Sequence, residues 1–155
     1  MQTVNKIVRL FGGLDWLKAG NYIRLDNEPY MRLVIEYIGT GPRGLPLLSI
    51  AHYFEQNGDQ MRDPDLVCEV DAAGGFHPVS FRQDSTGTYN EAVFQDEQGK
   101  TMCRPGIVKD LKAFARVWNR NLSEQGFYAA AQQAVAGKVG AAELTDSDDG
   151  LVYNS

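Results

Sequence analysis

The densest group of chemistry-bearing side chains in this sequence lies between residues 55 and 65. Polar and charged residues crowd these eleven positions, and the candidates among them are Glu55, Gln56, Asn57, Asp59, Arg62, Asp63 and Asp65. His52 lies just upstream and His77 further along the chain. Carboxylate oxygens and imidazole nitrogens are ligands that divalent cations accept, so these residues are the first candidates for a metal site.

The same stretch also has the composition of a structured turn. The calcium-loop pattern fails, because Asp59 is not followed by alternating acids and a closing glutamate. Residues 57–59, Asn-Gly-Asp, enter positive φ readily, and Asn and Asp side chains can bond to nearby backbone. We therefore favour a structural turn with no cofactor and leave a divalent metal open as the alternative.

Two cysteines, Cys68 and Cys103, and two histidines, His52 and His77, are the other candidates for chemistry. A thiol and an imidazole can act as nucleophile and base, so either cysteine could pair with either histidine. Neither cysteine has a local activating signature, although Cys103, two residues before Pro105, comes nearest. Cys68 follows Val67 and is expected to be a buried small hydrophobe. No Cys-x-x-Cys pair is present, so no disulfide framework is implied.

The strongest single element is an amphipathic helix expected over residues 105–125. Its apolar residues advance in steps of three or four and form one stripe: Ile107, Leu111, Phe114, Trp118 and Leu122. Pro105 suits a first helical position, and Gly126 sits where a left-handed cap belongs. The opposite face is basic: Lys109, Lys112, Arg116 and Arg120. Solvated charge is the ordinary explanation for such a face, and a nucleic-acid-binding surface is the alternative.

Six runs with the composition of strands precede that helix. They cover residues 22–25, 31–38, 47–54, 66–70, 76–81 and 88–94, and short polar turns separate most of them. Parallel strands need long crossovers, so these connections predict antiparallel pairing. Pro78 removes a ladder donor and predicts a sheet edge or a bulge. With a helix from about residue 3 to residue 11, the fold class is α+β: a mainly antiparallel sheet of about six strands flanked by an N-terminal helix and a C-terminal amphipathic helix.

The chain is expected to hold one α+β domain over residues 1–127. Residues 128–155 become Ala-rich and then acidic, which predicts a weak helix or disorder. The 155 residues include 20 Asp and Glu against 15 Lys and Arg, a net charge of -5, which counts against a duplex-binding protein. There is no signal-peptide pattern and no apolar run long enough to span a membrane, so we expect a cytoplasmic protein with no membrane partner.

Five short motifs resemble a known family. They are residues 52–59 (His-Tyr-Phe-Glu-Gln-Asn-Gly-Asp), 61–65 (Met-Arg-Asp-Pro-Asp), 77–79 (His-Pro-Val), 118–122 (Trp-Asn-Arg-Asn-Leu) and 125–127 (Gln-Gly-Phe). The family is an uncharacterised small bacterial domain carried by phages, plasmids and integrative conjugative elements, and the resemblance covers about residues 5–127. It implies a mobile-element setting, in which accessory proteins often bind or inhibit host factors. It assigns no catalytic residue.

The sequence therefore predicts a non-enzymatic interaction protein of a mobile genetic element, with a protein partner and with modulation of host defence or element transfer as its suggested role. Its candidate surface comprises His52, Glu55, Asn57, Asp59, Arg62, Asp63, Asp65 and His77. The first alternative is a metal-dependent enzyme acting on nucleic acid or nucleotides, centred on His52, Asp59, Asp63 and Asp65. The second is a nucleic-acid-binding module that uses the basic helix face. A cleft with clustered acids would favour the enzyme, and a contiguous basic stripe would favour the nucleic-acid module.

Overall fold

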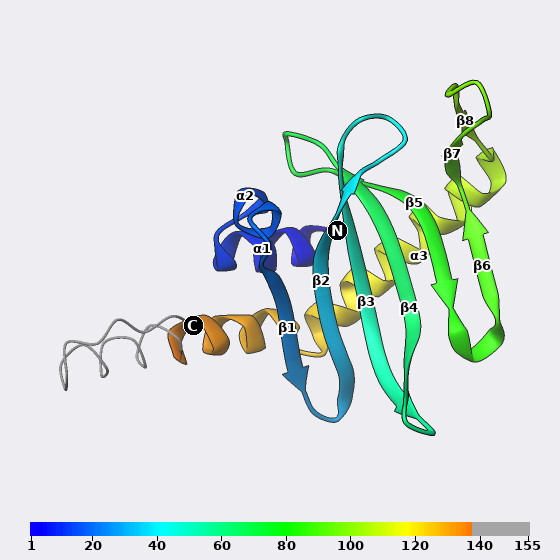
Figure 1. The fold of residues 1–155 in the computed structure, drawn as a ribbon. Helices are drawn as coiled ribbons and strands as arrows, with labels where there is room; N and C mark the ends of the chain where they lie inside the picture. Colours follow the sequence, from blue (N-terminus) through cyan, green and yellow to red (C-terminus); the bar gives the residue numbers. More distant parts are fainter. Residues whose placement is uncertain (138–155) are drawn as a thin grey trace.

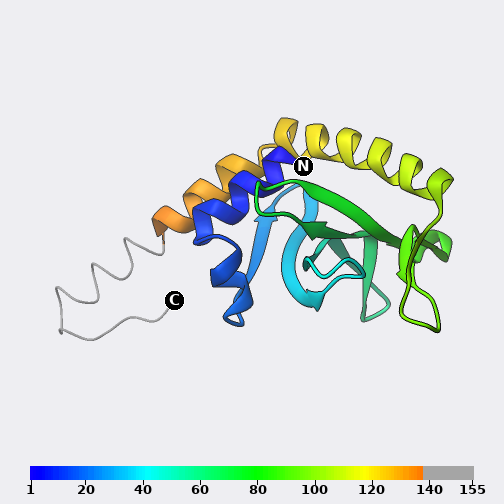
Figure 2. The ribbon, with the colours of Figure 1, turned by 90° about the horizontal axis from the view of Figure 1, so that it is seen from above.

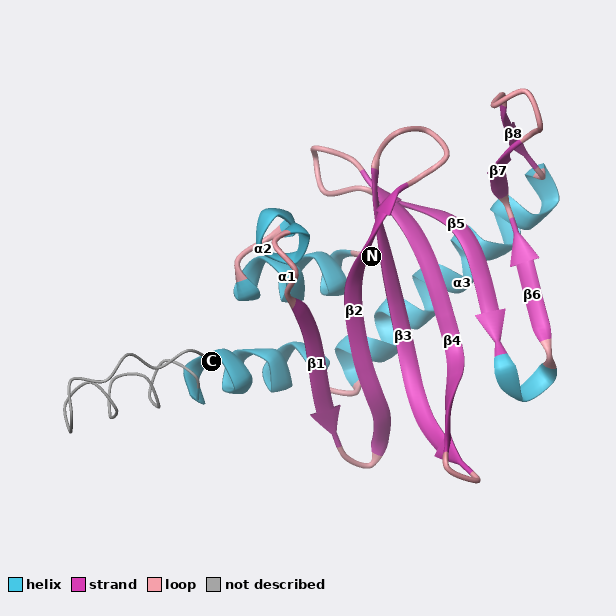
Figure 3. Cartoon of the chain, in the orientation of Figure 1, coloured by secondary structure: helices cyan, strands magenta, loops and turns pink. Residues whose placement is uncertain are grey.

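Helices open and close the described chain, and the strands lie between them (Figures 1 and 3). A computed structural model describes residues 1–137. In chain order the elements are α1 (Gln2–Phe11), α2 (Leu14–Lys18), β1 (Tyr22–Asn27), β2 (Tyr30–Thr40), β3 (Pro46–Gln56), β4 (Asp59–Val70), β5 (Phe76–Gln83), the 3-10 turn η1 (Asp84–Thr86), β6 (Thr88–Glu91), β7 (Val93–Gln95), β8 (Thr101–Cys103) and α3 (Pro105–Glu124). Residues 127–137 are again helical. The expected α+β class is confirmed.

Strands β1 to β6 form one antiparallel sheet in which each strand lies beside its neighbours in the sequence. The register aligns four apolar residues across adjacent strands: Ile35, Ile50, Leu66 and Phe81. Successive side chains alternate between faces, so this row defines one face of the sheet and its neighbours in sequence define the other. Figure 2 shows α1, α3 and the helix over residues 127–137 on one side of the sheet, which we call the helix-covered face.

The main core fills the space between the helix-covered face and these helices. Trp118 is 5% exposed, so the apolar stripe of α3 packs on the sheet as its spacing predicts. Gly126 ends the helix with φ of 84°, which confirms the left-handed cap. Phe127 and Ala131 are fully buried in the same cluster. The packed chain therefore continues past residue 127, and residues 138–155 of the expected tail lie outside the described residues.

The polar stretch from residue 55 to residue 65 is a β-hairpin rather than an extended turn. β3 continues to Gln56 and β4 begins at Asp59, so Asn57 and Gly58 alone make the reversal. Their φ angles of 53° and 84° confirm the positive φ expected there and are those of a tight hairpin turn. The predicted strand ends, at residues 54 and 66, were wrong because the projecting part of the hairpin carries polar residues on both faces. Without a buried face there is no alternation to mark a strand.

The run expected as one strand over residues 88–94 divides at Ala92. β6 completes the main sheet, whereas β7 pairs with β8 in a separate two-stranded sheet. The backbone N–H of Ala92 donates to the carbonyl of Val79 at 2.7 Å, and its own carbonyl accepts from Arg104 N–H at 2.8 Å. Val79 is the extra residue of a bulge beside Pro78, as the missing proline donor predicts. The three-residue strand β8 has no alternation of its own and was missed.

Candidate functional site

His52, a candidate metal ligand in the sequence, lies in the core. Its ring meets Trp118 edge-on at 5.4 Å between centroids and lies 5.5 Å from the ring of Phe127. The residue is 6% exposed, and Nδ1 lies 3.3 Å from the carbonyl oxygen of Arg32. Burial lowers the pKa of His52, because desolvation disfavours the charged ring. Its surroundings make it a packing residue of the helix-covered face.

The polar side chains of β4 are engaged by the segment that leads from β5 into η1. Asp84 Oδ2 accepts the backbone N–H of Arg62 at 2.8 Å and its Nε–H at 3.2 Å. Asp63 accepts hydrogen bonds from the Gln83 amide and the Ser85 hydroxyl. The Arg62 backbone N–H, and then its guanidinium, hold the pKa of Asp84 below its usual range. The expectation that the acids of this stretch bond to nearby backbone was wrong for Asp63, because its partners Gln83 and Ser85 come from the end of β5 and from η1.

Asp65 lies on the face of the sheet opposite to His52. It pairs with Ala51, the residue before His52, so the pleat separates the two side chains. Asp65 Oδ1 accepts the hydroxyl of Ser49 at 2.7 Å. Burial raises the pKa of Asp65, and the Ser49 hydrogen bond partly opposes that rise.

The remaining candidates of the polar stretch, Glu55, Asn57 and Asp59, are exposed at the hairpin tip. Glu55 lines an open polar hollow of about 540 Å³ together with Arg32 and Tyr53. Within residues 1–137, no group of three or more His, Cys, Asp or Glu side chains is placed to hold a metal ion. The pleat places His52 and Asp65, two of the residues on which the metal-dependent hypothesis was centred, on opposite faces of the sheet.

The basic residues of α3 form one continuous stripe that we call the basic stripe: Lys109, Lys112, Arg116 and Arg120. All four are exposed. Their steps of three and four residues keep them on one side of the helix, opposite the buried apolar stripe. None of them forms an ion pair with an acid of the described chain.

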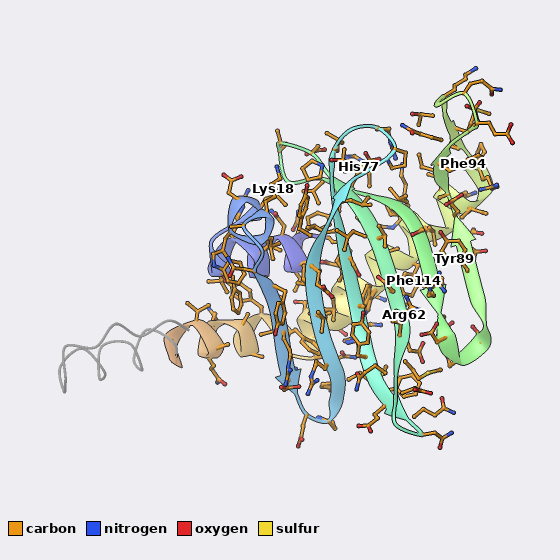
Figure 4. The ribbon with its side chains drawn as sticks, in the orientation of Figure 1. Lys18, Arg62, His77, Tyr89, Phe94 and Phe114 are labelled. Atoms are coloured by element: carbon orange, nitrogen blue, oxygen red, sulfur yellow. The ribbon has the colours of Figure 1, made fainter. Side chains whose placement is uncertain are left out.

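A cavity of about 260 Å³ lies where the β2–β3 loop, the start of β5, the β7–β8 hairpin and α3 meet. Its buried or half-buried apolar residues, which we call the floor, are Pro78, Val93 and Val108. Its more polar lining residues, which we call the rim, are Arg43, His77, Thr101, Cys103 and Lys112. In Figure 4, His77 lies at the end of the sheet from which the β2–β3 loop projects, whereas Arg62 lies in the opposite half.

Two carboxylates, those of Glu69 and Asp71, hold the rim residues Arg43 and His77 in place through hydrogen bonds. Glu69 is fully buried, and its Oε1 accepts Arg43 Nε–H at 3.0 Å. Glu69 Oε2 accepts the backbone N–H groups of Arg43 and Leu45, at 3.0 and 3.2 Å. Asp71 Oδ2 lies 2.7 Å from His77 Nε2, and its Oδ1 accepts the N–H of Gly75 at 2.8 Å. The β2–β3 loop is therefore anchored to the sheet.

His77, Lys112 and Cys103 were candidates in the sequence for separate reasons, and no sequence pattern placed them together. Arg43 was missed, because its loop matches no phosphate-binding pattern. The sequence signal that could have pointed to Arg43 is Glu69, an acid inside the strand expected over residues 66–70. Glu69 is fully buried, and a buried carboxylate requires a partner.

The family described as a domain of unknown function, DUF6908, matches residues 2–128. The chain belongs to this family. The match contains every lining residue of the cavity and the whole basic stripe. No curated protein and no solved structure matches the chain. Among the described residues, no helix combines the length and hydropathy that crossing a membrane requires.

The two thiols of this DUF6908 domain lie in different surroundings. Cys68 is fully buried, as expected, and burial raises its pKa to about 12. Cys103 is exposed and lines the cavity that His77 also lines. Within the described chain, no hydrogen bond joins that thiol to His77. The Nε2 atom of His77 is instead paired with Asp71. The arrangement therefore offers a lined cavity with an accessible thiol, rather than an assembled nucleophile and base.

Proposed function

We propose that this DUF6908 domain is a non-enzymatic interaction module that docks an acidic protein surface on the exposed side of α3. The observation that carries the proposal is the basic stripe: four exposed cations, unpaired within residues 1–137, on a chain whose net charge is -5. A one-signed patch of this kind attracts a surface of opposite sign and steers its approach.

Three features favour a protein over a nucleic acid as the partner. Val117 is 48% exposed and Ala113 is exposed beside the basic residues, which gives the stripe an apolar margin of the kind found inside protein interfaces. The stripe extends from Lys109 to Arg120, twelve helical residues and about 16 Å along the helix axis, so it can reach few phosphates. The excess of acids elsewhere on the chain opposes a polyanion more strongly than it opposes a local acidic patch.

The setting of a mobile genetic element is part of the same proposal, and its support is the sequence resemblance given above. In that setting the acidic partner is a factor of host defence or of element transfer, and docking on α3 modulates it. Affinity purification from the native host provides the test. Recovery of a partner unrelated to defence or transfer would contradict this part of the proposal.

The docking surface itself is tested with paired charge variants in the same purification. Replacing Lys109, Lys112, Arg116 and Arg120 together by Gln should remove the partner. A matched control replaces four other exposed cations by Gln: Arg9, Lys18, Arg24 and Lys100. This control makes the same change in net charge and should retain the partner. Equal loss in the two variants would show that overall charge, and not the stripe, governs binding.

A nucleic-acid-binding module is the competing function, and the same stripe favours it. Fluorescence anisotropy with a labelled 20-base-pair duplex distinguishes the two. We expect no binding at physiological salt by the unaltered chain. The opposite result would be micromolar binding that weakens steeply with salt, disappears in the stripe variant and persists in the control variant. That result would favour nucleic-acid binding over protein docking as the function of the stripe.

A further inference from the structure

We propose that the cavity between the β7–β8 hairpin and α3 binds a small organic carboxylate. The ligand's apolar body would rest on the floor of Pro78, Val93 and Val108, and its carboxylate would meet Arg43 and Lys112 at the rim. The proposal goes beyond the docking of a protein on α3. It concerns a different ligand and a largely different set of residues, with Lys112 common to both.

The size and lining of the cavity select the class of ligand. Its volume of about 260 Å³ is slightly below the roughly 300–1,000 Å³ of sites for drug-sized ligands, so a compact acid is favoured. Val93 is 3% exposed and Pro78 is buried, and an apolar floor gains more from a hydrocarbon body than from a hydrated inorganic ion. No acidic residue of the described chain lines the cavity, which disfavours a cationic ligand.

The rim has donors left over for an anion. Glu69 engages Arg43 through Nε and the backbone, and no hydrogen bond or ion pair within residues 1–137 occupies the terminal amino groups of that guanidinium. Lys112 is exposed and has no acidic partner in the described chain. A guanidinium fork matches the two oxygens of a carboxylate, and an ammonium group adds a second charge-assisted contact.

The walls of the cavity are held in place before any ligand arrives. The carbonyl oxygen of Pro42 accepts the Gln95 amide at 3.1 Å and the Thr101 hydroxyl at 3.0 Å, which ties the β7–β8 hairpin to the β2–β3 loop. Phe94, labelled on that hairpin in Figure 4, stacks against the guanidinium of Arg104, whose Cζ lies 4.2 Å from the centroid of the Phe94 ring. A preformed site loses less entropy on binding, so even a small ligand can be retained.

Cys103 supplies the readout, because it is exposed in the cavity while Cys68 is fully buried. Iodoacetamide is added to the full chain, and peptide mass spectrometry follows the alkylation of each cysteine. The Cys103 sulfur attacks the methylene carbon, a sulfur–carbon bond forms as the carbon–iodine bond breaks, iodide leaves, and the thiol proton passes to solvent. Cys68 should stay unmodified and so reports that the fold is intact.

Benzoate and its neutral isostere benzamide are the probes. Millimolar benzoate should slow the alkylation of Cys103 at least threefold, whereas benzamide should slow it little, because it lacks the charge that Arg43 and Lys112 recognise. Equal protection by the two compounds, or none by either, overturns the proposal. Inorganic phosphate separates a carboxylate from a bare anion. Protection by phosphate as strong as that by benzoate would show that the floor takes no part and would also overturn it.

Single-charge variants locate the effect. Arg43→Gln and Lys112→Gln should each raise the benzoate concentration that gives half-maximal protection about two- to fivefold, as expected for the loss of one solvent-exposed ion pair. Lys109→Gln is the matched control, because it makes the same change on the same helix outside the cavity. An equal rise in Lys109→Gln would assign the effect to general surface charge and contradict the proposal.

The two proposals fail separately. Lys109→Gln combined with Arg120→Gln should weaken protein docking and leave benzoate protection unchanged, while Arg43→Gln should do the reverse. Loss of both activities in each of these variants would mean that one site had been counted twice.

Discussion

Near the β3–β4 hairpin, charged side chains of β4 bond to the end of β5 and to η1, whereas at the β2–β3 loop end charged side chains surround a cavity. Asp63 and Asp84 are each occupied by side chains or backbone of a neighbouring segment. Glu69 and Asp71 also accept several hydrogen bonds, but their partners Arg43 and His77 in turn line an open space. Carboxylates stabilise the fold at both ends. At the β2–β3 loop end they also position the side chains of Arg43 and His77 at the edge of the cavity.

The comparison shows that the density of polar residues along a sequence does not locate a site. The hairpin end holds the richest run of acids and amides in the chain, yet its side chains alternate between two faces and spread along two strands. The cavity end draws single residues from four separate segments, and these converge. Convergence of unpaired donors on a lined space is the property that makes a binding site.

The largest expected effect tests whether His52 belongs to the core or to the polar hairpin end. Trp118→Ala should lower the free energy of unfolding by about 3–5 kcal/mol, because it opens a large cavity beside the imidazole. Urea denaturation measures the change. Val117→Ala, at the next and exposed position, should stay within about 0.5 kcal/mol. A Trp118→Ala protein as stable as the unaltered one would place His52 outside the core.

The next effect sharpens the contrast between anchored and projecting acids. Glu69→Ala should cost about 3 kcal/mol, because it leaves two backbone donors and the Arg43 guanidinium without their partner. Asp59→Ala at the exposed hairpin tip should change stability by less than about 0.5 kcal/mol. The same denaturation measurement serves both. Similar losses in the two variants would erase the difference between the ends.

A smaller effect concerns Asp65, whose folded pKa is raised by burial. The folded state therefore binds the proton of Asp65 more tightly than the unfolded state does. This contribution to the free energy of unfolding is fully present below the unfolded pKa of about 3.9 and is lost as pH rises through the folded pKa. Asp65→Asn should be more stable than the unaltered chain at pH 7, and this advantage should vanish in acid. Melting temperatures across pH 3–8 provide the check, and an advantage that grows in acid would reverse the assigned direction.

Asp84→Asn is the counterpart with the opposite sign. Its folded pKa is lowered, chiefly by the Arg62 backbone N–H, so its contribution is present above about pH 3.9 and is lost as pH falls through the folded value. This variant should be less stable than the unaltered chain at pH 7, and the deficit should shrink toward pH 2. Parallel pH profiles for the two variants would show that a common charge effect, rather than their different contacts, governs both.

The smallest expected effect concerns metal at the hairpin end. Because no cluster of ligands is placed there among the described residues, millimolar calcium or manganese should leave the melting temperature unchanged at constant ionic strength. Asp59→Asn and Asp59→Ala should then behave alike, with little change in either. A metal-dependent rise in melting temperature that both substitutions abolish would restore the metal hypothesis.

Local chemistry decided much of the fold. Alternating apolar residues marked the buried parts of the strands, the stripe through Trp118 marked α3, and Asn57, Pro78 and Gly126 marked the hairpin turn, the bulge and the helix end. Each of these signals lies within a few residues of the element that it specifies, and each reports either burial or a restricted φ.

The two surfaces to which we assign functions by proposal divide along the same line. The basic stripe was predictable, because helical periodicity alone places Lys109 and Arg120 on one face. The cavity was not predictable, because its residues Arg43, His77, Cys103 and Lys112 come from four segments. Only the pairing of β4 with β3 and with β5, the β7–β8 hairpin and the course of α3 bring these segments together. Which face His52 joined was likewise fixed by the pleat and by the helices that cover it. Sequence determines local geometry through short-range sterics and patterning, whereas the meeting of distant residues depends on how complete elements pack.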